Sequence, residues 1–440
     1  MTTIRVILAL ASANKWHLHQ LDVNTAFLHG DLKEKVYMKI PQGLCVDNPH
    51  LVCKLEKSLY GLKQASRQWH SKLTGFLLQF GYQKSFADHS LFIKSTDLNF
   101  TSILVYVDDH VLAGNIIIEI NRIKKLLDIE FSIKDLGQLN FFLGMEVART
   151  NKGIFLYQRK YALDLLEDTG MLGSKPCSTA MEYAKRLISS IDGELLSDPT
   201  TYRRLMGKLL YLTHTRPDLS FTVGYCSQFI AKPTNLHFEG AKRILRYLKG
   251  SISAGIFFPA ESDFKIKGYT DSDWAGCPDS RKSVSGYCFY LGHALISWKS
   301  KKQQVVARSS TEAEYRAIAL ASCEAQWLAY LLKDLQITHP EAIALFCDNQ
   351  SAIHIAANPI FHERTKHIEV DCHSVREKIQ SGLIHLLSIP TMSQIAKYIH
   401  QILVSWHLHE ITFQARNVRH PRSSLWASVR VGKSRRRNKE

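Results

Sequence analysis

Several common sequence features are absent from this chain of 440 residues. Its nine cysteines are odd in number and include no C-x-x-C pair, and no stretch reaches the roughly 20 apolar residues of a membrane-spanning helix. There is also no low-complexity segment and no repeat of fixed period. These absences argue against a disulfide framework, a cysteine-based zinc site, a membrane protein and a solenoid. We therefore expect reduced thiols in an intracellular chain, cytoplasmic or nuclear and not secreted.

The N-terminal segment resembles a secretory signal peptide, but its apolar run is too short. Arg5 precedes the apolar run Val6–Leu10, and Ala11-Ser-Ala13 resembles a cleavage site. The run is short and leads directly into Trp16. We therefore predict a helix of the folded domain at this position.

Length and charge indicate a large basic globular protein. The chain is long enough for two or three domains, each with its own core. It carries 56 basic against 40 acidic residues, a formal net charge of +16. A surplus of this size favours a polyanionic partner such as nucleic acid, although a basic patch on another kind of protein gives the same number.

Two adjacent carboxylates interrupt an apolar segment. The run Ser102–Leu112 is rich in β-branched and aromatic residues and predicts a strand, a tight turn and a second strand, with Asp108 and Asp109 at the tip. Charged groups beside a core are costly unless they are paired or bound to a metal ion, which suggests a divalent cation. Aspartate also favours turns, so both could be ordinary turn residues. A third acid, Asp22, ends a short apolar segment upstream.

Four segments, in their order and spacing, resemble the reverse transcriptase of copia-type LTR retrotransposons. They are Leu21–Gly30, Val36–Met38, Ser58–Ala65 and Tyr106–Asp109. The resemblance extends from about residue 3 to about residue 394. It implies an RNA-directed DNA polymerase whose partners are an RNA template, a DNA primer and deoxynucleoside triphosphates.

The resemblance also implies roles for individual residues. Asp22 and Asp108 would bind two Mg²⁺ ions, with Asp109 in support and Mn²⁺ able to substitute. Two ions roughly 4 Å apart can activate the primer 3′-hydroxyl and stabilise the leaving oxygen of the triphosphate. The residues implied to contact the incoming nucleotide are Phe27, Tyr60 and Gly61, and those implied to hold the primer end are Leu143, Gly144 and Met145. Phe27 could instead be a core residue, and Gly61 a turn residue.

Two basic stretches are candidates for contact with phosphates. The first interleaves cations with aromatic residues, and comprises Lys54, Lys57, Tyr60, Lys63, Arg67 and Trp69. The second is an amphipathic helix predicted at 238–248, whose polar positions include Lys242, Arg243, Arg246 and Lys249. Both patterns fit a solvated helix face as well. The whole stretch from about 153 to 253 is predicted to be helical, with a polar loop at 176–199.

A second group of acids lies in the C-terminal third. The pattern predicts a strand ending at Asp271, two strands around Gly292, a long helix opening at Ser309, and a strand ending at Asp348. This layout resembles a type 1 ribonuclease H, and residues 268–377 resemble the copia-type version. The resemblance implies a second two-metal site that cleaves the RNA of an RNA–DNA hybrid. Its four candidate metal ligands are Asp271, Glu314, Asp348 and Glu369.

Two of these ligands have rivals. Thr311 and Glu314 have the spacing of a capping box, and Glu312 would then be the ligand. We favour Glu314 because it precedes an apolar run, as the family's helix acid does. Asp371 competes with Glu369, which the family pattern of Lys-His-Ile followed by an acid selects.

Histidines near the fourth acid are weaker candidates. His362 or His367 could shuttle protons, because imidazole titrates near neutral pH. A zinc site built from His367, Glu369 and His373 would lack a fourth ligand at plausible spacing.

We therefore predict an α/β (α+β) protein in four parts. These are a polymerase palm with partial fingers (1–152), a helical thumb and connection (153–260), an RNase H-like mixed sheet (261–390) and a divergent, disordered basic tail (391–440). Most of the fingers that precede Asp22 in the family are expected to be missing. A catalytically impaired nucleic-acid-binding remnant, in which RNase H cleavage is the surviving activity, is therefore the alternative to an active enzyme.

Overall fold

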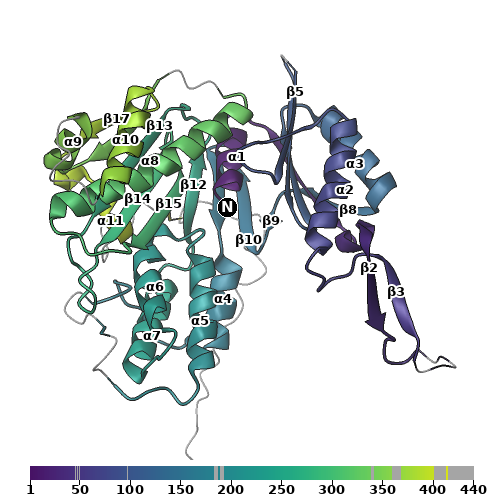
Figure 1. Ribbon diagram of the computed structural model, residues 1–440, viewed down its shortest axis with the longest axis horizontal. Helices are drawn as coiled ribbons and strands as arrows, with labels where there is room; N and C mark the ends of the chain where they lie inside the picture. The colour runs from purple at the N-terminus through teal and green to yellow at the C-terminus, as the bar shows by residue number, and fades with distance from the viewer. Residues whose placement is uncertain are drawn as a thin grey trace, which may run out of the picture.

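A computed structural model describes most of the chain, namely residues 1–44, 46, 48, 50–96, 98–182, 187–188, 193–337, 341–358, 368–400 and 413–414. Strands and helices are mixed throughout, which confirms the predicted fold class (Figure 1). His362 and His367 lie outside the described residues, as does most of the predicted tail. The predicted disorder is wrong for the first part of that tail, 391–400, because Gln394, Ala396 and Ile399 are fully buried there. The three predicted boundaries between the four parts stay predictions.

The first sheet carries the hairpin with the adjacent aspartates. Its order is β4-β5-β6-β7-β1-β8, with strands at Gln83–Lys84 (β4), Leu91–Ser95 (β5), Phe100–Tyr106 (β6), Asp109–Gly114 (β7), His17–Val23 (β1) and Ile133–Gln138 (β8). Alternate residues enter two different cores: Ile103 and Leu112 pack under the helices α2 (Ala65–Gln79) and α3 (Ile117–Phe131), whereas Leu104 and Val111 face the opposite side. Because both faces are covered, the strands are nearly continuous apolar runs.

The N-terminal helix α1 (Thr2–Ala13) lies inside the protein. Every residue from Thr3 to Ser12 is buried, which confirms the prediction of a helix of the fold. One apolar core surrounds α1 (Figure 1). It contains side chains from the first sheet, called the polymerase sheet below, from a second sheet, and from the sheet of β13–β17, called the RNase H-like sheet below. The first helix therefore joins parts of the chain that are far apart in sequence.

The second sheet combines segments from both sides of a predicted boundary. Its order is β18-β12-β11-β10-β9, at Phe413–Gln414, Ala254–Pro259, Gly153–Tyr157, Met145–Thr150 and Phe141–Phe142. Strand β11 begins at Gly153, where we predicted helix. The helical part begins after it, with α4 (Arg159–Asp168), α5 (Pro199–Leu212), α6 (Ser220–Cys226) and α7 (Asn235–Gly250) around a separate core. A small hairpin, β2 (Asp31–Lys39) and β3 (Val52–Lys57), projects from the first sheet (Figure 1).

The cations of α7 stabilise the segment that follows α4. Arg243 contacts Glu182 at 2.6 Å, Arg246 donates to the Lys175 carbonyl at 2.9 Å, and Lys249 donates to the Ser174 carbonyl at 2.5 Å. The amphipathic helix is therefore confirmed. All four predicted polar cations are hydrogen-bonded within the fold, since Lys242 donates to Glu239 at 2.7 Å. They are also half-exposed, so the helix has a partly solvated face whose charges are paired within the fold.

The RNase H-like sheet is mixed, as predicted. Its order is β15-β14-β13-β16-β17, at Ala294–Lys302, Val284–Leu291, Ile266–Ser272, Ile343–Cys347 and Ile384–Ser388. β13, β14 and β15 are antiparallel, whereas β16 runs parallel to both β13 and β17. The helices of this part are α8 (Ser310–Asp334), α9 (Gln350–Ala357), α10 (Glu369–Gln380) and α11 (Lys397–His400). Short 3₁₀ turns lie at Ala26–His29, Pro217–Leu219, Ser227–Phe229 and Thr391–Ser393.

The long helix α8 links the RNase H-like part to the polymerase sheet. At its C-terminal end the Asp334 carboxylate accepts hydrogen bonds from Ser85 Oγ at 2.6 Å, Phe86 N at 2.8 Å and Ala87 N at 3.0 Å. About two turns earlier in the helix, Trp327 Nε1 donates to the Ala87 carbonyl at 2.8 Å. The loop between β4 and β5 is therefore held on the end of α8.

We expect the substitution Asp334→Ala to lower the free energy of unfolding by roughly 1.5 kcal/mol, because hydrogen bonds to a charged acceptor are lost. Calorimetric melting of the full chain measures the change. Lys333→Ala, at an exposed neighbour, is the control and should change stability by less than about 0.5 kcal/mol. Equal melting temperatures for the two variants would show that this contact contributes nothing.

Two candidate acidic sites

The three predicted polymerase acids come from neighbouring strands. β6 and β7 are joined through Val107 and Asp108, and Tyr106 pairs with Asp109, so Asp109 is the first residue of β7 and not part of the tip. Asp22 on β1 lies directly opposite Asp109. Residues directly opposite in an antiparallel pair share one face, and like charges there are destabilising. The fold therefore places two carboxylates where an uncompensated pair is unfavourable.

The turn between β6 and β7 is fixed from outside the hairpin. Val107 has φ of 53°, a left-handed conformation that is unfavourable for a β-branched residue. Trp69 Nε1 donates to the Val107 carbonyl at 2.9 Å, and Val23 N donates to the Asp108 carbonyl at 2.9 Å. Trp69 is only 2% exposed. Its predicted role as a stacking partner for nucleic acid is therefore wrong: the ring is buried beneath the turn.

Each carboxylate of the hairpin has a polar neighbour. The Tyr60 hydroxyl donates to the Asp108 carboxylate, at 3.0 and 3.1 Å from its two oxygens, and Gln20 Nε2 donates to Asp109 at 3.1 Å. Burial raises the pKa of Asp109, and the charges of Asp22 and Asp108 act in the same direction. Within the described chain, oxygens of these three acids do not all lie within 4.8 Å of one another.

The residues predicted to contact the nucleotide lie beside Asp108. The rings of Phe27 and Tyr60 are 4.4 Å apart between centroids, and Tyr60 is 53% exposed. Gly61 has φ of 97°, a conformation that L-residues rarely adopt, so a glycine is favoured at this turn. Tyr60 thus contacts Asp108 directly, Phe27 packs against Tyr60, and Gly61 follows Tyr60 in the chain.

The predicted primer-binding hairpin is present between β9 and β10. Leu143 and Gly144 form its turn with φ of 50° and 73°. A Cβ at Gly144 would lie 3.2 Å from the Tyr211 hydroxyl of α5, so the turn packs closely against the helical part. Met145 is fully buried in the core, backbone included, so its predicted contact with a primer is wrong for the structure as it stands.

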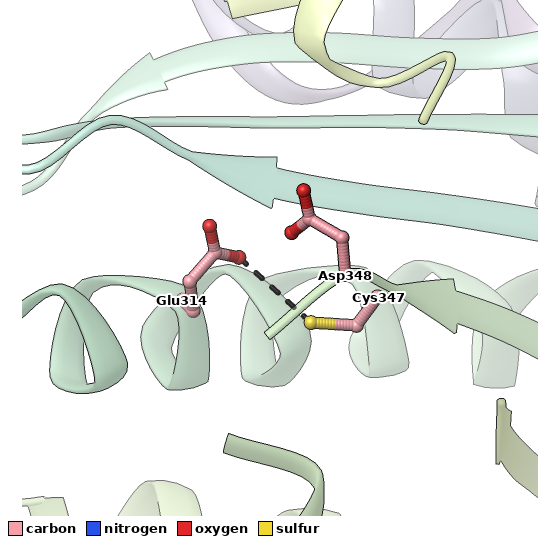
Figure 2. A group of neighbouring side chains, drawn as sticks. All are labelled: Glu314, Cys347 and Asp348. Atoms are coloured by element: carbon pink, nitrogen blue, oxygen red, sulfur yellow. Dashed lines mark hydrogen bonds between the residues drawn. The ribbon is translucent and has the colours of Figure 1, made fainter. Parts of the chain in front are cut away.

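The second acidic group brings together β13, α8 and β16. Glu314 is hydrogen-bonded to Asp271, and Ser272 N donates to the Glu314 carboxylate at 3.2 Å. Ligand atoms of Glu314, Asp348 and Cys347 all lie within 4.8 Å of one another (Figure 2). Cys347 Sγ is 3.9 Å from Glu314 Oε2. Three of the four predicted RNase H ligands are therefore close neighbours.

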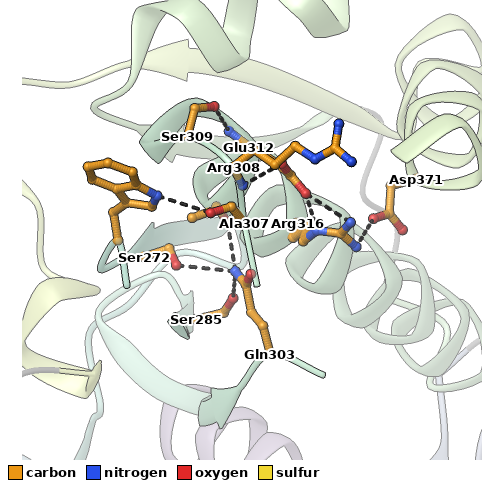
Figure 3. Close-up of polar contacts among 11 residues, drawn as sticks. Ser272, Ser285, Gln303, Ala307, Arg308, Ser309, Glu312, Arg316 and Asp371 are labelled. Carbon is orange, nitrogen blue, oxygen red and sulfur yellow. Dashed lines mark hydrogen bonds and ion pairs between the residues drawn. The ribbon is translucent and has the colours of Figure 1, made fainter. Parts of the chain in front are cut away.

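The start of α8 decides between the two glutamates. Ser309 is the N-cap, and its hydroxyl accepts from Glu312 N at 3.2 Å. The Glu312 carboxylate accepts from Arg308 N at 2.8 Å and pairs with Arg316 at 3.0 Å (Figure 3). A capping box of Thr311 and Glu314 is therefore wrong. Glu312 stabilises the helix start, which leaves Glu314 facing Asp271.

The fourth acid lies apart from the other three. Glu369, the first residue of α10, is 3.7 Å from His373, and both are exposed. Asp371 is 3.5 Å from Arg316, the cation that also binds Glu312 (Figure 3). Neither residue belongs to the group around Glu314 and Asp348 in the described chain. The choice of Glu369 stays a prediction.

Sequence comparisons identify the family of the chain. The family model described as "Reverse transcriptase (RNA-dependent DNA polymerase)" matches residues 1–183. The chain is 45% identical over 396 residues to the Retrovirus-related Pol polyprotein from transposon RE1 of Arabidopsis thaliana, covering 90% of this chain and 27% of that protein. It is 33% identical over 299 residues to a putative transposon Ty5-1 protein of Saccharomyces cerevisiae, covering 67% of this chain and 97% of that protein. The chain belongs to the copia-type retrotransposon Pol family.

This Pol chain spans about a quarter of the length of RE1. Among solved structures, the foamy viral protease-reverse transcriptase in complex with RNA/DNA hybrid aligns with 85% of the Pol chain and 44% of that chain, at 12% identity and a TM-score of 0.49. The family assignment rests on the sequence relatives. No helix in the described part of the Pol chain combines the length and apolar character needed to span a bilayer, and no disulfide joins cysteines described there.

The RNase H-like acids have the chemistry of a divalent-cation site. Burial, together with the charges of Asp271 and Asp348, raises the pKa of Glu314 to about 10. Burial likewise raises the pKa of Cys347 above its ordinary value. Carboxylate oxygens are the ligands that Mg²⁺ and Mn²⁺ prefer, and a bound cation would offset the repulsion. The residues present therefore fit such an ion.

Two contacts were missed by sequence reasoning. Cys347 precedes Asp348, and neighbouring residues of a strand point to opposite faces, so nothing in the pattern predicted both beside Glu314. The Tyr60–Asp108 hydrogen bond joins residues 48 positions apart and leaves no local signal.

The pKa of Glu314 predicts an unusual pH dependence without added metal. In the folded state the group keeps its proton up to about pH 10, whereas in the unfolded chain it loses it near pH 4.5. The folded state therefore binds more protons between these values, and the free energy of unfolding falls as the pH rises. Glu314→Gln removes this contribution, so we expect the stability of this variant relative to the wild type to increase from pH 5 to pH 9.

Chelator-treated protein melted across that pH range measures the effect. Glu377→Gln, at an exposed glutamate of α10, is the matched control and should follow the wild-type curve. Parallel curves for Glu314→Gln and wild type would contradict the assignment.

Proposed function

We propose that this chain is an RNA-directed DNA polymerase with RNase H activity, copying RNA into DNA and cleaving the RNA of RNA–DNA hybrids. The observation that carries the proposal is the assembly of two separate groups of carboxylates. Each group is built from elements distant in sequence: Asp22, Asp108 and Asp109 in one, and Asp271, Glu314 and Asp348 in the other.

Divalent cations bound at these groups would activate the attacking oxygen and stabilise the leaving one. In the polymerase group, Asp22 and Asp108 would hold the cations, and Asp109 would support them. The paired rings of Phe27 and Tyr60 would form the wall beside the sugar of the incoming nucleotide. The turn at Gly144 would hold the primer end.

In the RNase H-like group, Asp271, Glu314 and Asp348 would hold the cations, with Glu369 as fourth ligand. Because Glu314 is protonated at neutral pH when no cation is present, cation binding would release its proton. The net charge of +16 would favour the polyanionic partners that both reactions need, namely an RNA template, a DNA primer and an RNA–DNA hybrid.

Hybrid cleavage alone is a second candidate function. The Asp108 carboxylate is hydrogen-bonded to Tyr60, and the three polymerase acids do not gather within 4.8 Å as Glu314 and Asp348 do. This difference favours the RNase H-like group as the more complete of the two sites.

Two substitutions separate the activities. Asp108→Asn should lower primer extension on a primed RNA template about 100-fold or more and leave hybrid cleavage unchanged, and Asp348→Asn should do the reverse, because each removes one charged ligand. Both assays use the full chain with Mg²⁺. Asp164→Asn, at an exposed position of α4, is the matched control and should change neither rate.

The outcomes discriminate between the candidates. Hybrid cleavage that depends on Asp348, without primer extension, would select the second function. Absence of both activities in the wild-type chain would refute both.

A further inference from the structure

Gln303 is a half-buried amide just after strand β15, in the loop that leads to α8. Its backbone N–H donates to the Ser283 carbonyl at 2.8 Å. Its side-chain Nε2 lies 3.3 Å from Ser272 Oγ, 3.0 Å from Ser285 Oγ and 2.9 Å from the Ala313 carbonyl (Figure 3). One amide nitrogen therefore donates to two strands and a helix.

The acceptors of Gln303 adjoin the acidic group. Ser272 follows Asp271 on β13, and Ala313 precedes Glu314 on α8. Ser285 on β14 is the register partner of Ser272. The amide thus ties the strand that carries Asp271 to the first turns of the helix that carries Glu314.

The carbonyl end of the same amide indicates why a glutamine is present. Gln303 Oε1 is buried and has no hydrogen-bond partner among the described residues. Burying an acceptor without a partner is unfavourable, so apolar packing alone would select a methionine or leucine here. The hydrogen bonds donated by Gln303 Nε2 must therefore offset the free-energy cost of burying Oε1.

The two carboxylates need such a connection. Glu314 and Asp271 are hydrogen-bonded to each other, and both side chains are buried, at 5% and 7% exposure. The separation of the two carboxylates therefore depends on the contacts that hold the helix against the strand. Ser272 N donates one hydrogen bond to Glu314. The amide of Gln303 adds contacts to the Ser272 hydroxyl on the strand and to the Ala313 carbonyl on the helix.

We infer that Gln303 is a positioning residue of the RNase H-like site, whose amide holds Asp271 and Glu314 at the separation that a divalent cation bridges. The inference rests on the proposed function for the identity of the reaction, and on geometry alone for cation binding. Gln303 itself would touch neither cation nor substrate.

The test replaces Gln303 with methionine in the full chain, because methionine has similar size and no donor. Gln304→Met is the matched control: the adjacent glutamine is exposed and makes no hydrogen bond recorded in the described structure. Mn²⁺ binding is measured by titration calorimetry, with Asp108→Asn present in every protein so that the polymerase group contributes little. Hybrid cleavage and primer extension are measured on the same variants without Asp108→Asn.

We expect Gln303→Met to weaken Mn²⁺ binding about 10- to 100-fold, as loss of a residue that orients metal ligands does elsewhere. The Mg²⁺ concentration for half-maximal hybrid cleavage should rise and kcat should fall, while KM for the hybrid stays within about twofold. Primer extension should be unchanged, which also shows that the chain is folded. Gln304→Met should match the wild type throughout.

Wild-type Mn²⁺ affinity in Gln303→Met, or a loss of thermal stability alone, would overturn the inference. If Gln303→Met fails to fold, Gln303→Glu, which keeps the shape and loses the donor, must show the same loss of affinity. A wild-type chain that binds Mn²⁺ through this group without cleaving hybrid would refute the proposed function, and the calorimetric comparison would still decide the role of Gln303. Absence of Mn²⁺ binding in the Asp108→Asn protein would overturn the inference.

Discussion

Burial of helix α1 is the constraint on which the arrangement of this protein depends. Its apolar residues lie in one core with side chains from the polymerase sheet, the sheet of β9–β12 and the RNase H-like sheet. Each large apolar side chain that is fully buried contributes about 1.5–3 kcal/mol, so separating these sheets would expose a costly surface. The loop held by Asp334 on the end of α8 adds a polar connection between the same parts. The two acidic groups are thus built on one continuous framework.

Within that framework, both groups concentrate negative charge beside buried surface. Asp22 faces Asp109 across two strands, and Glu314 faces Asp271 across a strand and a helix. Folding forces these neighbours together, because apolar packing of the surrounding strands outweighs their repulsion. Burial is the largest cause of the raised pKa of Glu314, and the charges of Asp271 and Asp348 act in the same direction. A divalent cation bound at either group would offset the repulsion between its carboxylates.

Polar contacts from remote parts of the chain keep the acids in place. Trp69 holds the carbonyl of Val107 in the turn beside Asp108, and Gln303 joins the elements of Asp271 and Glu314. Both side chains are aimed at backbone or hydroxyl acceptors next to the acids, and neither is acidic. Such residues hold the segments next to the acids without adding charge to them.

Local patterns in the sequence determined which segments form strands and helices, and which of these end in an acidic residue. The hairpin near Asp108, the strands around Gly292 and the helix that begins after Ser309 all follow from periodicity and turn residues, which act over a few positions. Only the tertiary structure decided that Trp69 is buried, that Glu312 closes the helix while Glu314 faces Asp271, and that Cys347 joins Asp348. The burial of Trp69 under Val107, the approach of Glu314 to Asp271 and that of Cys347 to Glu314 depend on contacts between residues far apart in sequence, whose energies no local pattern contains.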